Sequence, residues 1–243
     1  MPFAAVLRSE WIKIASVRSL YGALTAVLLA TVGITLLAFA TMDPADHSAA
    51  DPLLDAFYAL NFGHIAALSF GATALSSEFR HGALRISLTV VPDRGHLYMA
   101  KTVVVGALVL GVGLVTAFTV FLTGQAMLGE RALDLTAPGA VRACVGAGIY
   151  LALMALMAAG LATVLRSAVG ALGILVPLIL LLSFVFGDVA AGVAQFLPDR
   201  AGQQVLRQHP VGDLGPWTGL GVTALWALAL LLAGWWTIRR RDA

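Results

Sequence analysis

The chain has 243 residues and a mass of 25.3 kDa, and 60% of its residues are hydrophobic while only 12% are charged. An ordinary soluble domain carries about 25% charged residues, so this composition excludes a soluble enzyme. The 15 basic and 13 acidic residues give a net charge of +2 and are clustered along the chain. We therefore expect an integral membrane protein.

Six stretches of 21 to 28 residues contain no Asp, Glu, Lys or Arg. A helix needs about 20 apolar residues to cross the hydrocarbon core of a bilayer, and each stretch meets that length. The predicted membrane-spanning helices cover residues 20–41, 56–77, 102–124, 143–165, 168–187 and 216–238. The predicted fold class is an all-α membrane protein that forms a single transmembrane domain over its whole length.

The basic residues predict which side of the membrane each loop faces. If the N-terminus is cytoplasmic, the inner segments hold 11 of the 15 basic residues and the outer segments hold four. An excess of Lys and Arg marks the cytoplasmic side, so we predict that both termini are cytoplasmic. A cleaved signal peptide is the alternative for the first span, but the apolar core there exceeds the ~7–15 residues of a signal peptide.

Residues 3–18 are predicted to form an amphipathic helix before the first span. An apolar arc that includes Trp11 lies opposite a polar face that includes Lys13, and Arg18 follows at the end of the helix. Glu10 is the exception, because it lies on the apolar side. Such a helix lies in the inner membrane interface, with its basic face toward anionic lipid. The alternative is a basic flank that only orients the first span.

Polar residues are rare within the spans, and the second span carries two of them. Asn61 and His64 are three residues apart and therefore share one helical face. Polar side chains at this depth usually face a bundle interior or water. We place Asn61 and His64 on a substrate path at a dimer interface, and the alternative is a hydrogen bond to a neighbouring helix.

The last outer loop, residues 188–213, does not have the pattern of a plain loop. Apolar residues at helical spacing precede Pro198 and Asp199, and a second short apolar run follows. Two short helices broken by Pro-Asp predict a re-entrant or interfacial hairpin between the fifth and sixth spans.

The sequence contains none of the common motifs of nucleotide or metal chemistry. It has no Gly-Lys pair and therefore no phosphate-binding loop, and it has no His-Glu-x-x-His or Cys-x-x-Cys motif. Asp43, Asp46, His47 and Asp51 form an acidic cluster that we interpret as a solvated loop and not as a metal site. No carboxylate lies within a span, which disfavours a proton-driven carrier and an intramembrane enzyme.

The segment between the second and third spans, residues 78–101, has the pattern of a folded cytoplasmic elbow. Leu84 and Leu88 form an apolar edge four residues apart. The run from Pro92 to Gly95 is a strong turn signal, which ends the elbow helix before the third span begins.

This elbow reads Glu-Phe-Arg-x-Gly-x-Leu-Arg-x-x-Leu-x-x-x-Pro-x-Arg and resembles the elbow of bacterial ABC type-2 permeases, which are the membrane subunits of ATP-driven exporters. The residues that carry the resemblance are Glu78, Phe79, Arg80, Gly82, Leu84, Arg85, Leu88, Pro92 and Arg94. The opening run from Glu10 through Trp11 to Lys13, followed by Arg18, is also similar to members of that family. Ala83 departs from the pattern, since Thr is more usual there.

The resemblance implies a permease that forms a homodimer or a heterodimer and docks separate ATP-binding cassette ATPase subunits through the elbow. ATP and Mg would bind to the ATPase, so this chain is not expected to be an enzyme or to need a cofactor. Leu84 and Leu88 are expected to anchor the ATPase, while Arg80, Arg85 and Arg94 contact its acidic groups. The alternative is that these arginines only orient the elbow at the lipid surface.

The resemblance also implies export across the bacterial plasma membrane, with membrane lipid as a further partner and no nucleic acid. Spans this apolar favour a hydrophobic or amphiphilic substrate such as a drug, an antibiotic or a lipid. The alternatives are an ATP-independent secondary carrier or channel, and an intramembrane enzyme.

Overall fold

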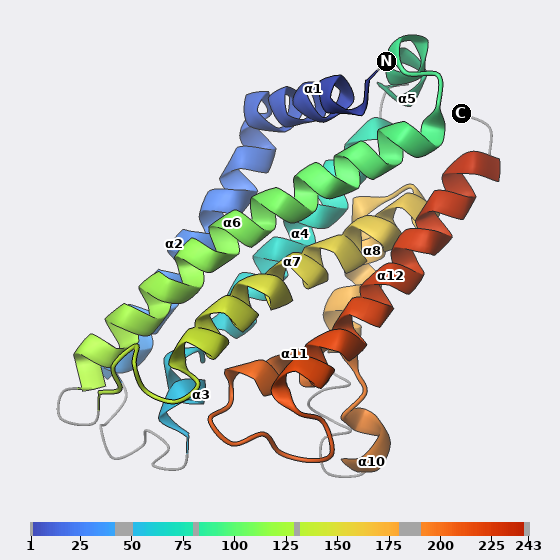
Figure 1. Cartoon of the computed structure of the whole chain (residues 1–243). Helices are drawn as coiled ribbons and strands as arrows, with labels where there is room; N and C mark the ends of the chain where they lie inside the picture. Colours follow the sequence, from blue (N-terminus) through green and yellow to red (C-terminus); the bar gives the residue numbers. More distant parts are fainter. Residues whose placement is uncertain (1, 42–50, 80–82, 129–131, 180–190, 241–243) are drawn as a thin grey trace.

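A computed structural model of the chain describes residues 2–41, 51–79, 83–128, 132–179 and 191–240. Within these ranges all regular structure is helical and there is no strand, so the prediction of an all-α fold is confirmed. The long helices run beside one another as a bundle (Figure 1). In chain order the elements are α1 (Phe3–Ser16), α2 (Arg18–Thr41), α3 (Pro52–Ala56), α4 (Leu60–Ser76), η1 (Ser77–Phe79), α5 (Ala83–Val90), α6 (Arg94–Leu128), α7 (Ala140–Leu165), α8 (Ala168–Pro177), α10 (Ala191–Ala194), α11 (Pro198–Gln203), η4 (Gln204–Leu206) and α12 (Pro216–Arg240).

Four of the described helices, α2, α6, α7 and α12, are long and apolar enough to cross a membrane. The second predicted span corresponds to α4, a helix of 17 residues that follows the short α3. The fifth corresponds to α8, and the second half of that span lies outside the described residues. The structure therefore supports an integral membrane protein, while the count of six spans stays a prediction.

α7 forms the centre of the bundle, where it packs against α4, α6 and α12. Small residues let these helices approach closely. A Cβ atom added at Gly71 of α4 would lie 2.0 Å from the carbonyl oxygen of Ala155, and one at Gly160 would lie 2.6 Å from the backbone of Leu230. In a membrane, where the hydrophobic effect does not drive helices together, such close packing is a main source of stability.

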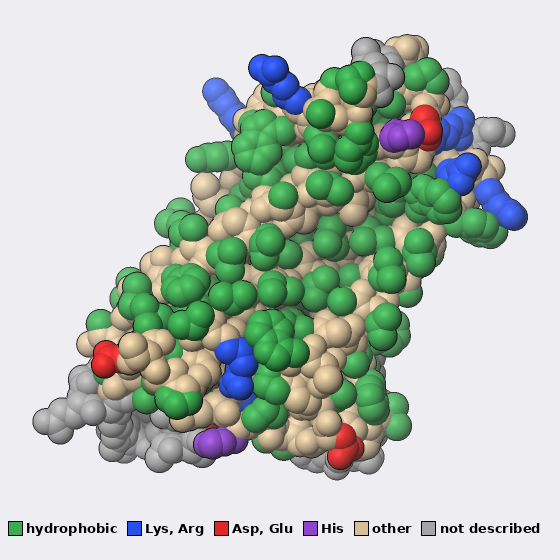
Figure 2. Space-filling view, in the orientation of Figure 1, with side chains coloured by type: hydrophobic (Ala, Val, Ile, Leu, Met, Phe, Trp, Pro, Cys, Tyr) green, Lys and Arg blue, Asp and Glu red, His purple; other side chains and the backbone are tan. Residues whose placement is uncertain are grey.

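The two ends of the bundle carry different elements. α1 and α5 lie at one end of the bundle, together with the end of α12. α3, α10 and α11 lie at the other end (Figure 1). We call these the α1 end and the α11 end. Most Lys and Arg side chains visible in Figure 2 gather at the α1 end, and hydrophobic side chains cover the middle of this face. This distribution agrees with a cytoplasmic α1 end.

α1 covers one end of the bundle at an angle to α2, because the backbone at Val17 is extended and breaks the helix (Figure 1). One face of α1 buries Val6, Glu10 and Ile14 against the protein, mainly against α6. Trp11 points away from that face and is half exposed. The apolar arc predicted from the sequence is therefore divided between contact with the protein and an exposed surface.

The segment before α12 contains two short helices, α10 and α11, and the second of them begins at Pro198. Pro at the first position of a helix loses no hydrogen bond, since that N–H has no partner within the helix. In the described residues Pro198 and Asp199 are therefore the first two residues of α11, and the hairpin stays a prediction. The re-entrant character of this segment stays a prediction, and residues 188–190 lie outside the described residues.

Candidate functional site

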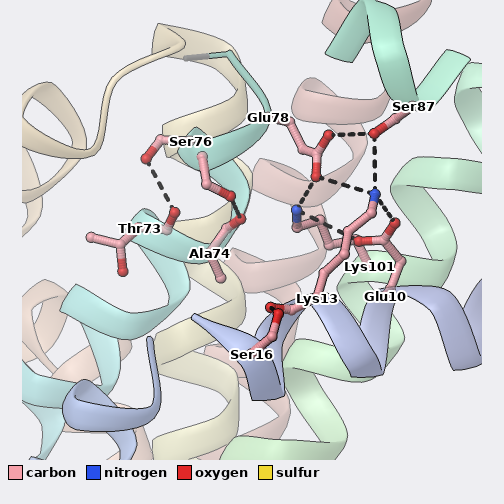
Figure 3. A network of polar contacts seen from close by, with 10 residues as sticks. Glu10, Lys13, Ser16, Thr73, Ala74, Ser76, Glu78, Ser87 and Lys101 are labelled. Atoms are coloured by element: carbon pink, nitrogen blue, oxygen red, sulfur yellow. Dashed lines mark hydrogen bonds and ion pairs between the residues drawn. The ribbon is translucent and has the colours of Figure 1, made fainter. Parts of the chain in front are cut away.

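Three segments that are distant in the sequence bring charged side chains together at the α1 end (Figure 3). Glu10 comes from α1, Glu78 from η1 and Lys101 from α6. Lys13 of α1 and Ser87 of α5 complete the group, which we call the ion cluster. It ties the predicted interfacial helix and the predicted elbow to α6, the helix that contains the third predicted span.

The contacts within the ion cluster are short and reciprocal. The Lys101 ammonium donates to Glu78 Oε1 and lies 3.6 Å from Glu10 Oε2. Lys13 Nζ lies 2.7 Å from Glu10 Oε1 and 3.7 Å from Glu78 Oε1. Ser87 Oγ accepts from Lys13 at 3.1 Å and donates to Glu78 Oε2 at 3.0 Å. Two ammonium groups therefore bridge the two carboxylates, and the Ser87 hydroxyl joins Lys13 to Glu78.

Most charged groups of the ion cluster are buried, so their removal from water costs free energy that the contacts must offset. The side chains of Glu10 and Lys101 are 1% and 5% exposed, whereas that of Lys13 is 40% exposed. Removing an ion from water costs several kcal/mol unless a partner of opposite charge compensates it. Lys101 is the buried cation between two carboxylates, so the geometry of the cluster depends chiefly on this residue.

The protonation state of Glu78 follows from its surroundings. Burial raises the pKa of Glu78, but the ammonium groups of Lys101 and Lys13 and the hydroxyl of Ser87 more than offset that effect. The net pKa lies below the ordinary value, because every polar contact favours the charged form. Glu78 is therefore a carboxylate at neutral pH, as the ion pairs require.

The predicted elbow contains the short helix α5 and the first residues of α6, and a turn separates the two helices. α5 ends at Val90 and α6 begins at Arg94. Between them, Asp93 Oδ1 accepts from the backbone N–H groups of Gly95 and His96, at 2.8 Å and 3.2 Å, and so caps α6. The His96 ring, 2.6 Å from Asp93 Oδ2, and the backbone N–H of His96 hold the pKa of Asp93 below its usual range.

Several residues that the resemblance assigns to ATPase coupling have contacts within this chain. Leu84 is only 5% exposed and packs into the core. The Phe79 ring lies 5.6 Å from the guanidinium carbon of Arg166, and Arg94 donates to the carbonyl oxygen of Ile238 at 3.4 Å. Leu88 is partly buried against the core.

Other side chains of the elbow are exposed and are therefore available to a partner protein. Ile86 is 69% exposed on α5, and Thr89 and Pro92 are also exposed. Arg80 and Gly82 lie outside the described residues, as does the side chain of Arg85. Ile86 is therefore an exposed apolar side chain of α5 that is available to another protein, while the ATPase contacts of Leu84 and Leu88 stay predictions.

Sequence reasoning missed two members of the ion cluster, Ser87 and Lys101, as functional residues. A signal was present, because Glu10 lies on the apolar side of an amphipathic helix. A charged residue on a face that packs against protein needs a partner of opposite charge. Among the other residues predicted on this helix, Trp11 and Arg18 are exposed at the surface of the protein.

A second polar group lies at the α11 end and contains the predicted Asn61. The Tyr150 hydroxyl donates to Asp199 Oδ1 at 2.5 Å. Gln203 Nε2 donates to Asp199 Oδ1 and to Asn61 Oδ1, at 2.9 Å in both cases. We call Asn61, Tyr150, Asp199 and Gln203 the Asp199 cluster.

His64 lies beside this cluster and not at the surface. Its side chain is 1% exposed, and its ring meets the ring of Tyr150 edge-on at a centroid distance of 6.2 Å. Asn61, in contrast, is exposed. The two residues therefore face different surroundings despite their spacing, and their role in a substrate path stays a prediction.

Of the predicted acidic loop cluster, only Asp51 lies within the described residues. Its carboxylate accepts from the backbone N–H of Leu54, which caps α3, and from that of Gln208 at 3.0 Å. Asp51 thus joins α3 to the segment that precedes α12. Its role in the described structure is to cap a helix and join two segments.

The apolar bundle and the charged elbow define the class of the protein: it is an integral membrane protein in which all described regular structure is helical. The sequence profile of ABC-2 family transporter proteins matches residues 6–188, which is 183 of the 243 residues, and the chain belongs to this family. A search of curated proteins finds no match. The resemblance seen in the elbow is therefore confirmed, and permeases of this family generally pair with a separate ATPase subunit.

Proposed function

We propose that the chain is the permease subunit of an ATP-driven exporter that moves a hydrophobic or amphiphilic substrate across the bacterial plasma membrane. Two permease subunits, identical or different, pair with ATP-binding cassette ATPase subunits at the α1 end. ATP and Mg bind to those ATPase subunits, so the permease contributes the pathway and the coupling. Membership of the ABC-2 family and the apolar helices support this proposal.

The ion cluster is the observation that carries the proposal. A permease without a nucleotide site responds to ATP only through contact with its ATPase, and coupling needs an element that both subunits bias. The cluster connects the elbow through Glu78 and Ser87 to Lys101, which lies on the 35-residue helix α6. A displacement of α5 by the ATPase therefore acts directly on a helix that is long enough to cross the membrane.

The docking surface in this proposal is the exposed side of α5 and the turn that follows it. Ile86 supplies the apolar contact, with Thr89 and Pro92 beside it. An exposed large apolar residue at the centre of a polar surface is typical of an anchor in a protein interface. Arg80 and Arg85 are the expected donors to acidic groups of the ATPase.

Co-purification tests the proposal directly. The first observation to make is whether an ATP-binding cassette ATPase is encoded beside the gene. If it is, the permease is expressed with that ATPase, and substrate-stimulated ATP hydrolysis is measured after reconstitution in proteoliposomes. We expect Ile86→Asp to weaken ATPase binding about tenfold, because it places a charge in the apolar contact. Val211→Asp is the matched control, since Val211 is 62% exposed but lies at the α11 end.

The alternative, an ATP-independent secondary carrier, makes the opposite prediction. In that case no ATPase co-purifies with the wild-type permease, and an ion gradient alone drives transport in proteoliposomes. Equal ATPase binding by the wild type, Ile86→Asp and Val211→Asp would show that the exposed side of α5 is not the docking surface.

A further inference from the structure

The connection between α7 and α8 consists of two residues, Arg166 and Ser167, which we call the α7–α8 turn. Arg166 has a φ of 53° and a ψ of 26°, in the left-handed region that residues other than Gly rarely adopt. The Ser167 hydroxyl oxygen accepts from the backbone N–H of Gly170 at 3.1 Å and so caps α8. The backbone N–H of Ser167 donates to the carbonyl oxygen of Ala162 at 3.2 Å. The α7–α8 turn therefore fixes the direction in which α8 leaves α7.

The side chain of Arg166 reaches from the α7–α8 turn to the elbow. Its guanidinium carbon lies 5.6 Å from the centre of the Phe79 ring, a distance at which the ring stabilises a cation. Phe79 is the last residue of η1 and packs, partly buried, against the core. Phe79 and Leu84 of the elbow also line one small cavity together with Thr163, which lies in the last turn of α7. The elbow and the end of α7 therefore share one packed region, and Arg166 lies directly after it.

Two consecutive residues of η1 connect the elbow to different parts of the bundle. Glu78 accepts from Lys101 of α6, whereas Phe79 contacts Arg166 of the α7–α8 turn. α8 packs against α4 and α7 and corresponds to the first half of the fifth predicted span. A movement of η1 therefore acts on α6 through an ion pair and on α8 through the turn that precedes it.

We infer that Arg166 is a second coupling residue, which transmits a displacement of the elbow to α8 through its contact with Phe79. The inference rests on the proposed function, because the ATPase is what displaces the elbow. Arg166 is a positioning residue, since it holds the α7–α8 turn against the elbow. Gly would adopt the backbone conformation of this position with less strain, so the side-chain contact of Arg166 offsets a backbone cost.

Hydrogen exchange on the complex of permease and ATPase in lipid nanodiscs tests the inference, with a non-hydrolysable ATP analogue as the probe. In the wild type we expect the analogue to change amide exchange about threefold, both in residues 94–101 of α6 and in residues 168–171 of α8. Arg166→Gln removes the cation and Phe79→Leu removes the ring. Each should abolish the response of α8 while the response of α6 remains. Because Phe79→Leu alters no charge, a matching loss in both variants excludes an effect of charge on membrane orientation alone.

Two further variants separate coupling from the stability of the α7–α8 turn. Arg166→Lys keeps a cation near the ring and should keep the response of α8. Arg166→Gly relieves the backbone strain, so it should unfold at a higher temperature in detergent than Arg166→Gln. If Arg166 only stabilised the turn, the response of α8 would follow stability and return in Arg166→Gly. We expect Arg166→Gly and Arg166→Gln to lack the response equally, because neither has a cation.

Arg239→Gln is the matched control. The guanidinium carbon of Arg239 lies 4.6 Å from the centre of the Trp235 ring, but both residues belong to α12. This variant therefore removes a contact between an arginine and an aromatic ring at the same end of the bundle without separating two segments. Its responses in α6 and in α8 should equal those of the wild type.

Exchange on the permease alone provides a measurement that needs no ATPase. A helix of 10 residues depends on its tertiary contacts, so residues 168–171 should exchange about threefold faster in Arg166→Gln and in Phe79→Leu than in the wild type. Unchanged exchange in both variants would overturn the inference. A response of α8 to the ATP analogue that persists in both variants would also overturn it, while the proposed function stands.

Failure of the proposed function has a different signature. In that case the ATPase does not co-purify with the wild type, or the analogue changes exchange in neither α6 nor α8. Faster exchange of α8 in the two variants of the permease alone would then still support the link between elbow and α8, and unchanged exchange would refute it.

Discussion

The two polar clusters lie at opposite ends of the bundle and stabilise buried carboxylates in different ways. In the ion cluster, Glu10 and Glu78 are bridged by the ammonium groups of Lys13 and Lys101. In the Asp199 cluster, the neutral donors Tyr150 and Gln203 bind the carboxylate. Ammonium groups cancel the negative charge, whereas a hydroxyl and an amide satisfy hydrogen bonds without cancelling it.

This difference suits the proposed role of the α1 end. The ion cluster links α1, the elbow and α6 through two carboxylates and two ammonium groups. It resists displacement, because moving one member leaves a buried ion without its partner. Such a rigid connection is what coupling to an ATPase requires.

The largest expected effect is at the centre of the ion cluster. Lys101→Met removes the buried cation between Glu10 and Glu78, and breaking a buried ion pair by deleting one partner costs about 3–5 kcal/mol. We expect a matching loss of stability in unfolding of the purified permease in detergent. Lys13→Met is the comparison variant: Lys13 is 40% exposed, but it donates the hydrogen bond to the buried Glu10, so its loss should cost less, about 1–3 kcal/mol. Similar losses in both variants would show that burial does not dominate the cluster.

A smaller effect is expected at the Asp199 cluster. Tyr150→Phe deletes the hydroxyl that donates to Asp199 and leaves a buried acceptor without that partner, at a cost of about 1–3 kcal/mol. The same detergent unfolding experiment measures it. Tyr58→Phe removes the hydroxyl of an exposed tyrosine and should leave stability unchanged. If Tyr150→Phe costs as much as Lys101→Met, neutral donors and ion pairs hold buried carboxylates equally strongly in this protein.

The sequence alone predicted the helices and the elbow but not the ion cluster. Charge-free stretches and the turn at Pro92 depend on local composition and spacing, and four of the predicted spans are helices of membrane-crossing length. The contact between Glu10 and Lys101 depends on how α1 folds back over α6, which no local pattern specifies. Helical spacing likewise put Asn61 and His64 on one face, yet packing against Tyr150 buries only His64.

Acid should weaken the ion cluster through Glu78. The pKa of Glu78 is lowered in the folded protein from its ordinary value of 4.5, so the charged form stabilises the fold above that value. This contribution is lost as the pH falls through the lower, folded pKa. We expect the wild type to lose stability over that acid range, and Glu78→Gln to show a shallower loss while being less stable at neutral pH. Parallel pH profiles of the two proteins would contradict a lowered pKa at Glu78.

The smallest expected effect concerns the attachment of α5 to the ion cluster. Ser87 is the member that α5 contributes, and it contacts Lys13 and Glu78. Ser87→Ala removes two partly buried hydrogen bonds, but the ion pairs of Lys13 and Lys101 with the carboxylates remain, so the net cost should be about 1 kcal/mol. We expect the global stability of the permease to change little.

The change should instead appear as local opening of α5. Amide hydrogen exchange within α5 should become about tenfold faster in Ser87→Ala, because a helix of eight residues depends on its tertiary contacts. Thr89→Ala is the control on the same helix, since the Thr89 hydroxyl bonds only to the carbonyl oxygen of Ile86 among the contacts described. Faster exchange in Ser87→Ala, together with weaker stimulation of the ATPase by substrate, would mean that the cluster holds the elbow in the position that coupling needs. Unchanged exchange in both variants would mean that Leu84 and the core alone hold α5, and that the ion cluster acts on α1 and α6 without it.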